Sequence, residues 1–142
     1  MSLHPIELAG LRKVGEIARK SGIKFFPDQE AFQVAKELLV SDIPGAPVVD
    51  AEGKFVGFIS EVDILGALEL GRDISQLTAQ EIMVSDQIGI NRSTTIVEAL
   101  RIMKERHVLV LPLVREKDGV VTECVTRQDL LRVWVGIGVD PK

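Results

Sequence analysis

Cysteine, histidine and long apolar runs are all scarce in this sequence of 142 residues. Its single cysteine, Cys124, cannot close an internal disulfide, which excludes a disulfide-stabilised secreted domain and fits the reducing cytoplasm, where we predict that the protein resides. One cysteine and two histidines are too few for a structural metal site, so we predict none. Uncharged apolar runs extend to seven residues, as at 108–114, against the roughly 18 that a membrane span requires, so we expect no membrane partner.

An excess of positive charge is also missing. Lysine and arginine number 17 against 21 for aspartate and glutamate, which gives a net charge of −4. A strongly basic face would need a more acidic one elsewhere, so binding to duplex nucleic acid is disfavoured. Apolar residues make up 46% and charged residues 27%, which is typical of a soluble globular chain with enough apolar side chain for a core.

The most informative feature is an internal repeat at an offset of 65 residues. One residue is inserted in a turn, and the offset then becomes 66. The aligned pairs are Phe25 with Ile90, Pro47 with Pro112, Ser60 with Thr126, and Asp63 with Asp129. A unit of about 60 residues buries only roughly 60% of its unfolded surface, so we expect the two units to pack about a pseudo-two-fold axis with clefts between them.

Each unit predicts the order β-α-β-β-α, and hence an α/β (α+β) fold. Apolar residues three and four apart predict helices that include positions 31–38 and 96–103. We expect Pro27-Asp28 to open the first of these and Ser93 or Thr94 to cap the second. A further helix follows Ser60 and Thr126. The predicted strands are 22–26, 46–49 and 55–59 in the first unit, and 87–90, 111–114 and 120–125 in the second.

The residues at the strands and helix starts resemble a known motif. Gly45-Ala46-Pro47-Val48-Val49-Asp50 with Ser60-Glu61-Val62-Asp63 resembles one cystathionine-β-synthase (CBS) motif, and Leu111-Pro112-Leu113-Val114 with Thr126-Arg127-Gln128-Asp129 resembles a second. Two copies in register, each ending in Ser/Thr-x-x-Asp, make the resemblance specific. It implies a tandem CBS pair, or Bateman module. The implied parts are an N-terminal extension (1–13), a first motif (14–72), a linker (73–78) and a second motif (79–138).

The resemblance also implies a function. Family members sense adenosine-containing ligands, so the expected ligand is AMP, ADP, ATP or S-adenosylmethionine, bound as a regulator and not as a required cofactor. The signal would pass to an unidentified regulated protein. The hydroxyl and carboxylate of each Ser/Thr-x-x-Asp would bind the ribose, since a carboxylate accepts from both diol hydroxyls, and apolar residues would wall the base. The implied ligand-binding residues are Ser60, Asp63, Thr126, Arg127, Asp129, Ile43, Pro44, Val108 and Leu109.

The same residues have structural explanations, which stay open from the sequence alone. Ser/Thr-x-x-Asp is close to the helix capping box, and the apolar wall residues can be core. Some family members have His or Arg just before the motif proline, where these side chains bind phosphates. This chain has Pro44-Gly45 and Leu109-Val110 at those positions, which argues against a tightly bound triphosphate. Arg127 of the second half aligns with Glu61 of the first, and a cation favours phosphate where an acid repels it. We therefore predict that the second half holds the better site.

Two other function classes compete with ligand sensing. A small nucleotide-processing enzyme would need a nucleophile–base pair, paired acids or a metal. The sequence has no such pattern, so we predict no enzymatic activity and no catalytic residue. The alternative to a ligand sensor is a ligand-free CBS-fold scaffold for oligomerisation or interaction, which would not need the Ser/Thr and Asp in both copies.

The second helix of each unit predicts an interface. It is apolar almost all round, with a single charge beyond its first turn, Glu69 or Arg132. A helix on its own sheet needs only one apolar side, and we expect no internal partner for the other in so small a chain. Exposed apolar patches of that size mark interfaces. We therefore predict an isologous homodimer through these helices, with Trp134 in the contact, as the resemblance also implies.

Overall fold

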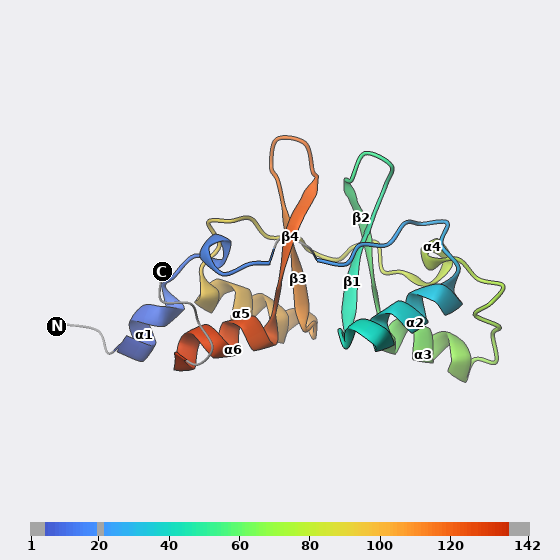
Figure 1. The fold of residues 1–142 in the computed structure, drawn as a ribbon, viewed down its shortest axis with the longest axis horizontal. Helices are drawn as coiled ribbons and strands as arrows, with labels where there is room; N and C mark the ends of the chain where they lie inside the picture. Colours follow the sequence, from blue (N-terminus) through green and yellow to red (C-terminus); the bar gives the residue numbers. More distant parts are fainter. Residues whose placement is uncertain (1–4, 20–21, 137–142) are drawn as a thin grey trace.

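The computed structural model describes residues 5–19 and 22–136, and contains two copies of one helix–hairpin–helix unit (Figure 1). The first copy comprises α2 (Ala31–Ser41), β1 (Gly45–Val49), β2 (Phe55–Ser60) and α3 (Glu61–Glu69). The second comprises α5 (Ile96–Arg106), β3 (Val110–Val114), β4 (Val121–Thr126) and α6 (Arg127–Val135). Three short helices complete the described chain: α1 (Pro5–Gly10), the 3-10 helix η1 (Val14–Glu16) and α4 (Ala79–Ile82). The predicted mixed fold with two repeats is confirmed.

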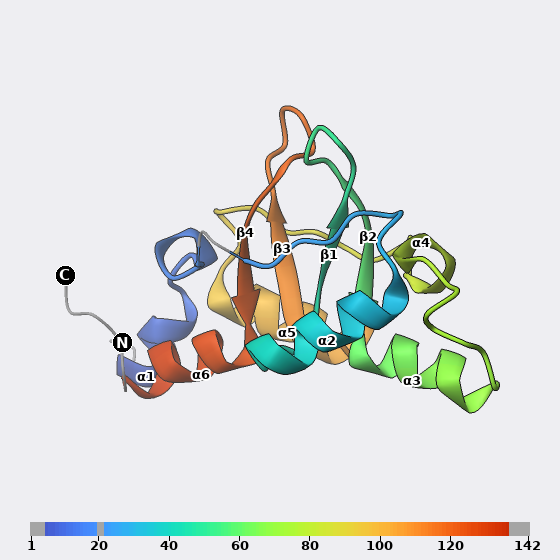
Figure 2. The ribbon, with the colours of Figure 1, turned by 45° about the vertical axis from the view of Figure 1, so that its right-hand side comes forward.

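The two hairpins stand side by side, and the four main helices gather at the end of the hairpins opposite their turns (Figure 2). Strands β1 and β3 contact each other where the copies meet. The hairpin turns also meet, because the amide of Phe55 donates to the Gly119 carbonyl and the amide of Val121 donates to the Gly53 carbonyl, both at 3.0 Å. These reciprocal bonds are what a pseudo-two-fold axis between the copies requires. Gly53 and Gly119 have φ of +83° and +76°, a conformation that favours glycine.

The strands predicted at 22–26 and 87–90 are wrong in extent. Each is a single parallel bridge, of Phe25 to Val48 and of Ile90 to Leu113. The chain leaves the sheet directly afterwards in both copies. After the first bridge the amide of Phe26 donates to the side chain of Gln29 at 2.7 Å. After the second bridge, the amide of Ser93 donates to the side chain of Asn91 at 2.8 Å. These turns stop the pairing after one residue.

The same turns displace the predicted starts of two helices. Helix α2 begins at Ala31 behind Glu30, and not at Pro27-Asp28. Helix α5 is capped by Thr95, whose hydroxyl accepts from the Glu98 amide at 3.2 Å. Ser93 and Thr94, predicted as the cap, instead close the preceding turn onto Asn91. The predicted caps of α3 and α6, Ser60 and Thr126, are confirmed.

Each copy has its own hydrophobic core. The buried face of α2 is formed by Ala31, Val34 and Leu38, and that of α5 by Ile96, Ala99 and Met103. The segment between α3 and α4 adds to the first core, since Leu77 is buried and its carbonyl accepts from the Ala31 amide at 2.8 Å. The cleft between the copies is therefore framed by two separately packed units.

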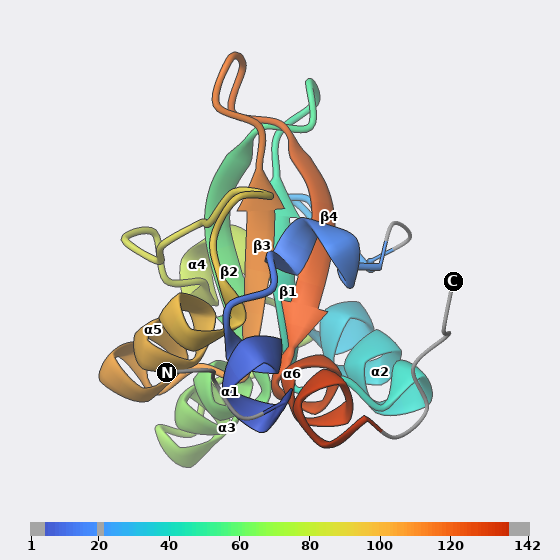
Figure 3. The same ribbon diagram turned by 90° about the vertical axis from the view of Figure 1, so that its left-hand side faces the viewer.

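Helix α1 covers one side of α6, as the end-on view shows (Figure 3). A Cβ added at Gly10 would lie 2.9 Å from the Trp134 ring, so this glycine lets the two helices approach closely. Trp134 packs partly buried against the second core. The expectation that α6 has no internal partner for its second side is therefore wrong, because the N-terminal extension supplies that partner.

Candidate functional site

A cleft of about 550 Å³ lies between the two copies, and both copies contribute to its walls. Six of the nine predicted residues line it: Ile43, Pro44, Leu109, Thr126, Arg127 and Asp129. The other three, Ser60, Asp63 and Val108, are not among the described residues that line this cleft. Val108 packs against the second core instead. The structure thus brings the apolar wall of the first copy to the hydroxyl and carboxylate of the second.

Backbone hydrogen bonds fix how each copy presents these residues. The loop before β1 is tied to the start of α3, because the Glu61 amide donates to the Pro44 carbonyl at 3.0 Å. The equivalent bond in the second copy runs from the Arg127 amide to the Leu109 carbonyl at 2.9 Å. Each apolar wall is therefore held beside the N-terminus of the helix in its own copy. Glu61 and Arg127, which align with each other in the repeat, both line the cleft. The acidic and the basic side chain therefore lie in the same site.

Thr126 and Asp129 form a capping box at the start of α6. The Thr126 amide donates to Asp129 Oδ2 at 2.9 Å, and the Asp129 amide donates to Thr126 Oγ1 at 3.2 Å. Asp129 is only 6% exposed. Its other oxygen, Oδ1, lies 3.3 Å from Arg19 Nε and 3.4 Å from Arg132 Nη1. The carboxylate therefore caps the helix with one oxygen and faces two cations with the other.

Ser60 and Asp63 form the same cap at the start of α3, but without the cations. The Ser60 amide and hydroxyl donate to Asp63 Oδ2 at 2.9 and 2.8 Å, and the Asp63 amide donates to Ser60 Oγ at 3.2 Å. Asp63 is less buried than Asp129, and it takes part in none of the ion pairs found among the described residues. The capping role is present in both copies, whereas the cationic surroundings belong to the second.

Among the lining residues that sequence reasoning missed are Arg19, Arg132 and Cys124. Arg132 follows Asp129 by three residues on a helix, a spacing that places the two side chains together. Arg19 has no such local signal, because it reaches the cleft through antiparallel pairing with Cys124. Burial raises the pKa of the Cys124 thiol to about 12. The thiol is thus protonated at neutral pH, as expected for an inert cysteine.

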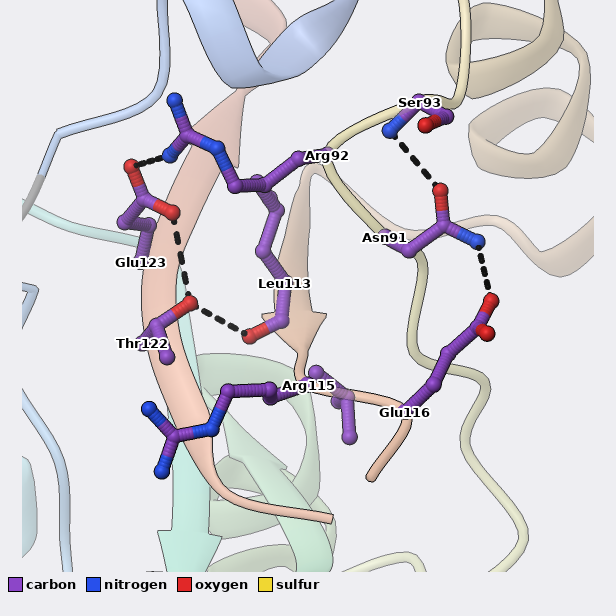
Figure 4. Close-up of a pocket in the computed structure, with 9 residues that line it drawn as sticks. Asn91, Arg92, Ser93, Leu113, Arg115, Glu116, Thr122 and Glu123 are labelled. Carbon is purple, nitrogen blue, oxygen red and sulfur yellow. Dashed lines mark hydrogen bonds and ion pairs between the residues drawn. The ribbon is translucent and has the colours of Figure 1, made fainter. Parts of the chain in front are cut away.

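A second hollow, of about 620 Å³, lies beside the β3–β4 hairpin (Figure 4). Its polar wall is centred on Glu123, which is buried and forms an ion pair with Arg92. The Thr122 hydroxyl also donates to Glu123 Oε1 at 3.2 Å. Arg92 further donates to the Gly15 carbonyl, which ties η1 to this hollow. Both carboxylate oxygens of Glu123 thus have partners within the protein, so this buried acid does not call for a ligand.

Glu123 also accounts for a difference between the copies. Gly57 is its counterpart in β2, and a Cβ there would lie 2.5 Å from the Met83 sulfur. By the 65-residue offset, Ala18 aligns with Met83, and Met83 packs against the first core whereas Ala18 packs against the second. The small and the large residue thus change places between the copies. Gly57 is combined with Met83 at the first core, and Glu123 is combined with Ala18 at the second.

The chain belongs to the CBS domain family, whose model matches residues 14–70 and 79–136. An uncharacterized protein of Methanopyrus kandleri is 27% identical over 121 residues, which are 84% of this chain and 61% of that protein. The inosine-5′-monophosphate dehydrogenase of Halobacterium salinarum is 30% identical over 139 residues, covering 88% of this chain and 27% of the enzyme. The chain therefore spans less than two thirds of either relative.

Among solved structures, the CBS domain pair of protein MJ0100 superimposes with a TM-score of 0.79. It shares 27% sequence identity, and the match covers 89% of this chain and 98% of that one. That structure is a complex with 5′-methylthioadenosine and S-adenosyl-L-methionine. Within residues 5–19 and 22–136, no helix is long and apolar enough to cross a bilayer, and no three or more metal-binding side chains gather.

Proposed function

We propose that the protein is a regulatory module that binds an adenosine-containing ligand in the cleft at Thr126 and Asp129. The observation that carries the proposal is the meeting of Asp129 with the apolar wall of the other copy in one cleft. A cleft between packed units, lined by apolar side chains and a few convergent polar groups, is the usual form of a small-molecule site. The complex of the related MJ0100 pair with two adenosine-type ligands supports this ligand class.

In the proposed binding mode, different residues bind different parts of the ligand. Asp129 accepts hydrogen bonds from the ribose hydroxyls, the side chains of Ile43, Pro44 and Leu109 enclose the base, and Arg127 pairs with a phosphate where the ligand has one. Ser60 and Asp63 would provide a second, weaker site, since no cation accompanies their carboxylate. The motifs would extend over 14–72 and 79–138, joined by 73–78; residues 1–4, 20–21 and 137–142 lie outside the described part of the chain.

Calorimetry on two matched variants tests the proposal. Asp129→Asn keeps the side-chain shape and removes the charge, and Asp63→Asn makes the same change in the same capping box of the other copy. A hydrogen bond to a charged group contributes about 1.5–3 kcal/mol, so Asp129→Asn should weaken AMP binding roughly tenfold or more. Asp63→Asn should change it by less than about threefold. Equal losses, or a larger loss for Asp63→Asn, would overturn the site.

One observation favours a ligand-free scaffold as the second candidate. Both carboxylates are already engaged in helix caps, so capping alone would account for them. A thermal shift experiment with AMP, ADP, ATP and S-adenosylmethionine separates the two, since a ligand that binds only the folded state raises the melting temperature. A shift with at least one of these compounds supports the sensor, and no shift with any of them supports the scaffold. A sensor should also leave AMP and ATP chemically unchanged after incubation with the protein.

The helical end of the molecule supports the proposed homodimer, through which a cytoplasmic partner protein would receive the signal. Several large apolar side chains there are exposed: Phe32, Leu39, Val40, Val62, Leu65, Leu68, Leu131 and Val135. They belong to α2, α3 and α6, and no other element of the described chain covers them. A surface of this kind is typical of an interface. Because Trp134 packs on α1, the proposed contact is better placed on the exposed side chains of α3.

A further inference from the structure

We propose that Arg19 makes the cleft select adenosine-type ligands that carry a phosphate over those that carry only the ribose. The proposal rests on the proposed function of the cleft, and it assigns Arg19 as a residue that determines specificity there. Nothing in the repeat pattern singles out this arginine, which lies 110 residues before Asp129 in the sequence.

Both oxygens of Asp129 have partners within the protein, and two guanidinium groups approach the oxygen that the helix cap does not use. Its Oδ2 accepts the Thr126 amide at 2.9 Å as part of the helix cap. Its Oδ1 lies 3.3 Å from Arg19 Nε and 3.4 Å from Arg132 Nη1. Arg132 donates a hydrogen bond to Oδ1, and Arg19 forms an ion pair with the same oxygen. A ribose hydroxyl that binds Oδ1 therefore competes with both arginines for it.

Arg19 is the arginine that a ribose hydroxyl displaces from Asp129. Arg132 stays near Asp129 because the two residues are three apart on α6. Arg19 comes from a separate segment, and its side chain is 67% exposed. Its backbone is held independently, by hydrogen bonds with Cys124 of 3.2 and 3.3 Å. The side chain can thus swing out of the ion pair while the segment stays on β4.

The consequence depends on whether the ligand has a phosphate. Adenosine displaces Arg19 from Asp129 and gives the guanidinium nothing in return, so the ion pair opposes binding. A nucleotide brings a new anion to the same cleft, and arginine binds phosphate through strong charge-assisted hydrogen bonds. Arg19 therefore lowers the affinity for the nucleoside and raises the affinity for the nucleotide. This opposition of sign distinguishes a selectivity residue from one that merely supports the fold.

The other charged side chains of the cleft are compatible with this exchange. Arg127 also lines it and forms none of the ion pairs among the described residues, so a phosphate meets a second available cation. The acids Asp42 and Glu61 line the cleft and are exposed, and neither pairs with Arg19 in the described chain. Asp129 is thus the acid that holds Arg19 before ligand binds.

The test is calorimetry with adenosine and AMP on the full chain, comparing the wild type with Arg19→Gln. Wild type should bind AMP more tightly than adenosine. In Arg19→Gln we expect adenosine to bind roughly three- to tenfold more tightly and AMP roughly three- to tenfold more weakly, as for one exposed charge-assisted pair. Arg19→Lys, which keeps the charge, should retain most of the preference for AMP.

Arg12→Gln is the matched control, because Arg12 belongs to the same N-terminal region, forms an exposed ion pair with Glu16 and does not line the cleft. It should leave both affinities unchanged. The inference is overturned if Arg19→Gln moves both affinities in the same direction or leaves their ratio unchanged. If AMP binding depends on Asp129 but not on Arg19, the proposed function stands and this inference fails. If neither compound binds the wild type, this inference fails, and the proposed function fails with it only if ADP, ATP and S-adenosylmethionine do not bind either.

Discussion

Gly57→Ala should destabilise the first copy, and a second change at Met83 should relieve most of the loss. The added Cβ would lie 2.5 Å from the Met83 sulfur and 3.0 Å from its two neighbouring carbons. Gly57 is buried in β2, so the strand cannot move away freely. Overpacking of a core costs typically 1–3 kcal/mol. Because the atoms met belong to a flexible side chain, we expect about 1–2 kcal/mol for Gly57→Ala.

A double-mutant cycle isolates this contact. Met83→Ala alone should also be destabilising, because it leaves a cavity beside Gly57. The double variant Gly57→Ala/Met83→Ala should lose about 1 kcal/mol less than the sum of the single variants, since the new methyl enters that space. Urea unfolding gives the free energies, and thermal unfolding should show Gly57→Ala melting about 3–8 °C lower. Additive losses would refute the exchange of bulk inferred from Ala18 and Glu123.

Two further predictions concern the cleft cysteine and the helical end. Cys124 should react slowly with a thiol reagent at pH 8 in the native protein and readily after unfolding; its raised pKa means that stability falls as pH rises from about 9 towards about 12, and fast native labelling would contradict this. Leu65→Glu should convert the proposed dimer to a monomer near 16 kDa by light scattering, while Glu69→Gln on the same helix should not. A monomeric wild type would refute the dimer.

Features set by neighbouring residues were predictable from the sequence. The caps at Ser60 and Thr126 depend on a carboxylate three residues later, so the local pattern contains the whole interaction. The hairpins are likewise marked by their Gly-containing turns. The cap of α5 was misplaced because Ser93, Thr94 and Thr95 all suit the role, and only the turn at Asn91 decides between them.

Features that depend on distant parts of the chain were not predictable in this way. The side of α6 at Trp134 looked uncovered because no sequence pattern indicates that α1 would pack there. Arg19 reaches Asp129 only because its segment pairs with β4. Ile43 and Pro44 line the same cleft as Asp129 of the other copy, and this too follows from how the units pack. The sequence identified six residues of the cleft, and the packing determined which of them meet and brought Arg19 and Arg132 to them.

A crystal structure of the full chain soaked or co-crystallised with AMP would show whether the cleft is the ligand site. We expect AMP in the cleft between the copies, with its ribose hydroxyls on Asp129 Oδ1, its base against Ile43, Pro44 and Leu109, and the Arg19 guanidinium moved from the carboxylate to the phosphate. An empty cleft at saturating AMP, or AMP bound only in the hollow beside Glu123, would contradict this expectation.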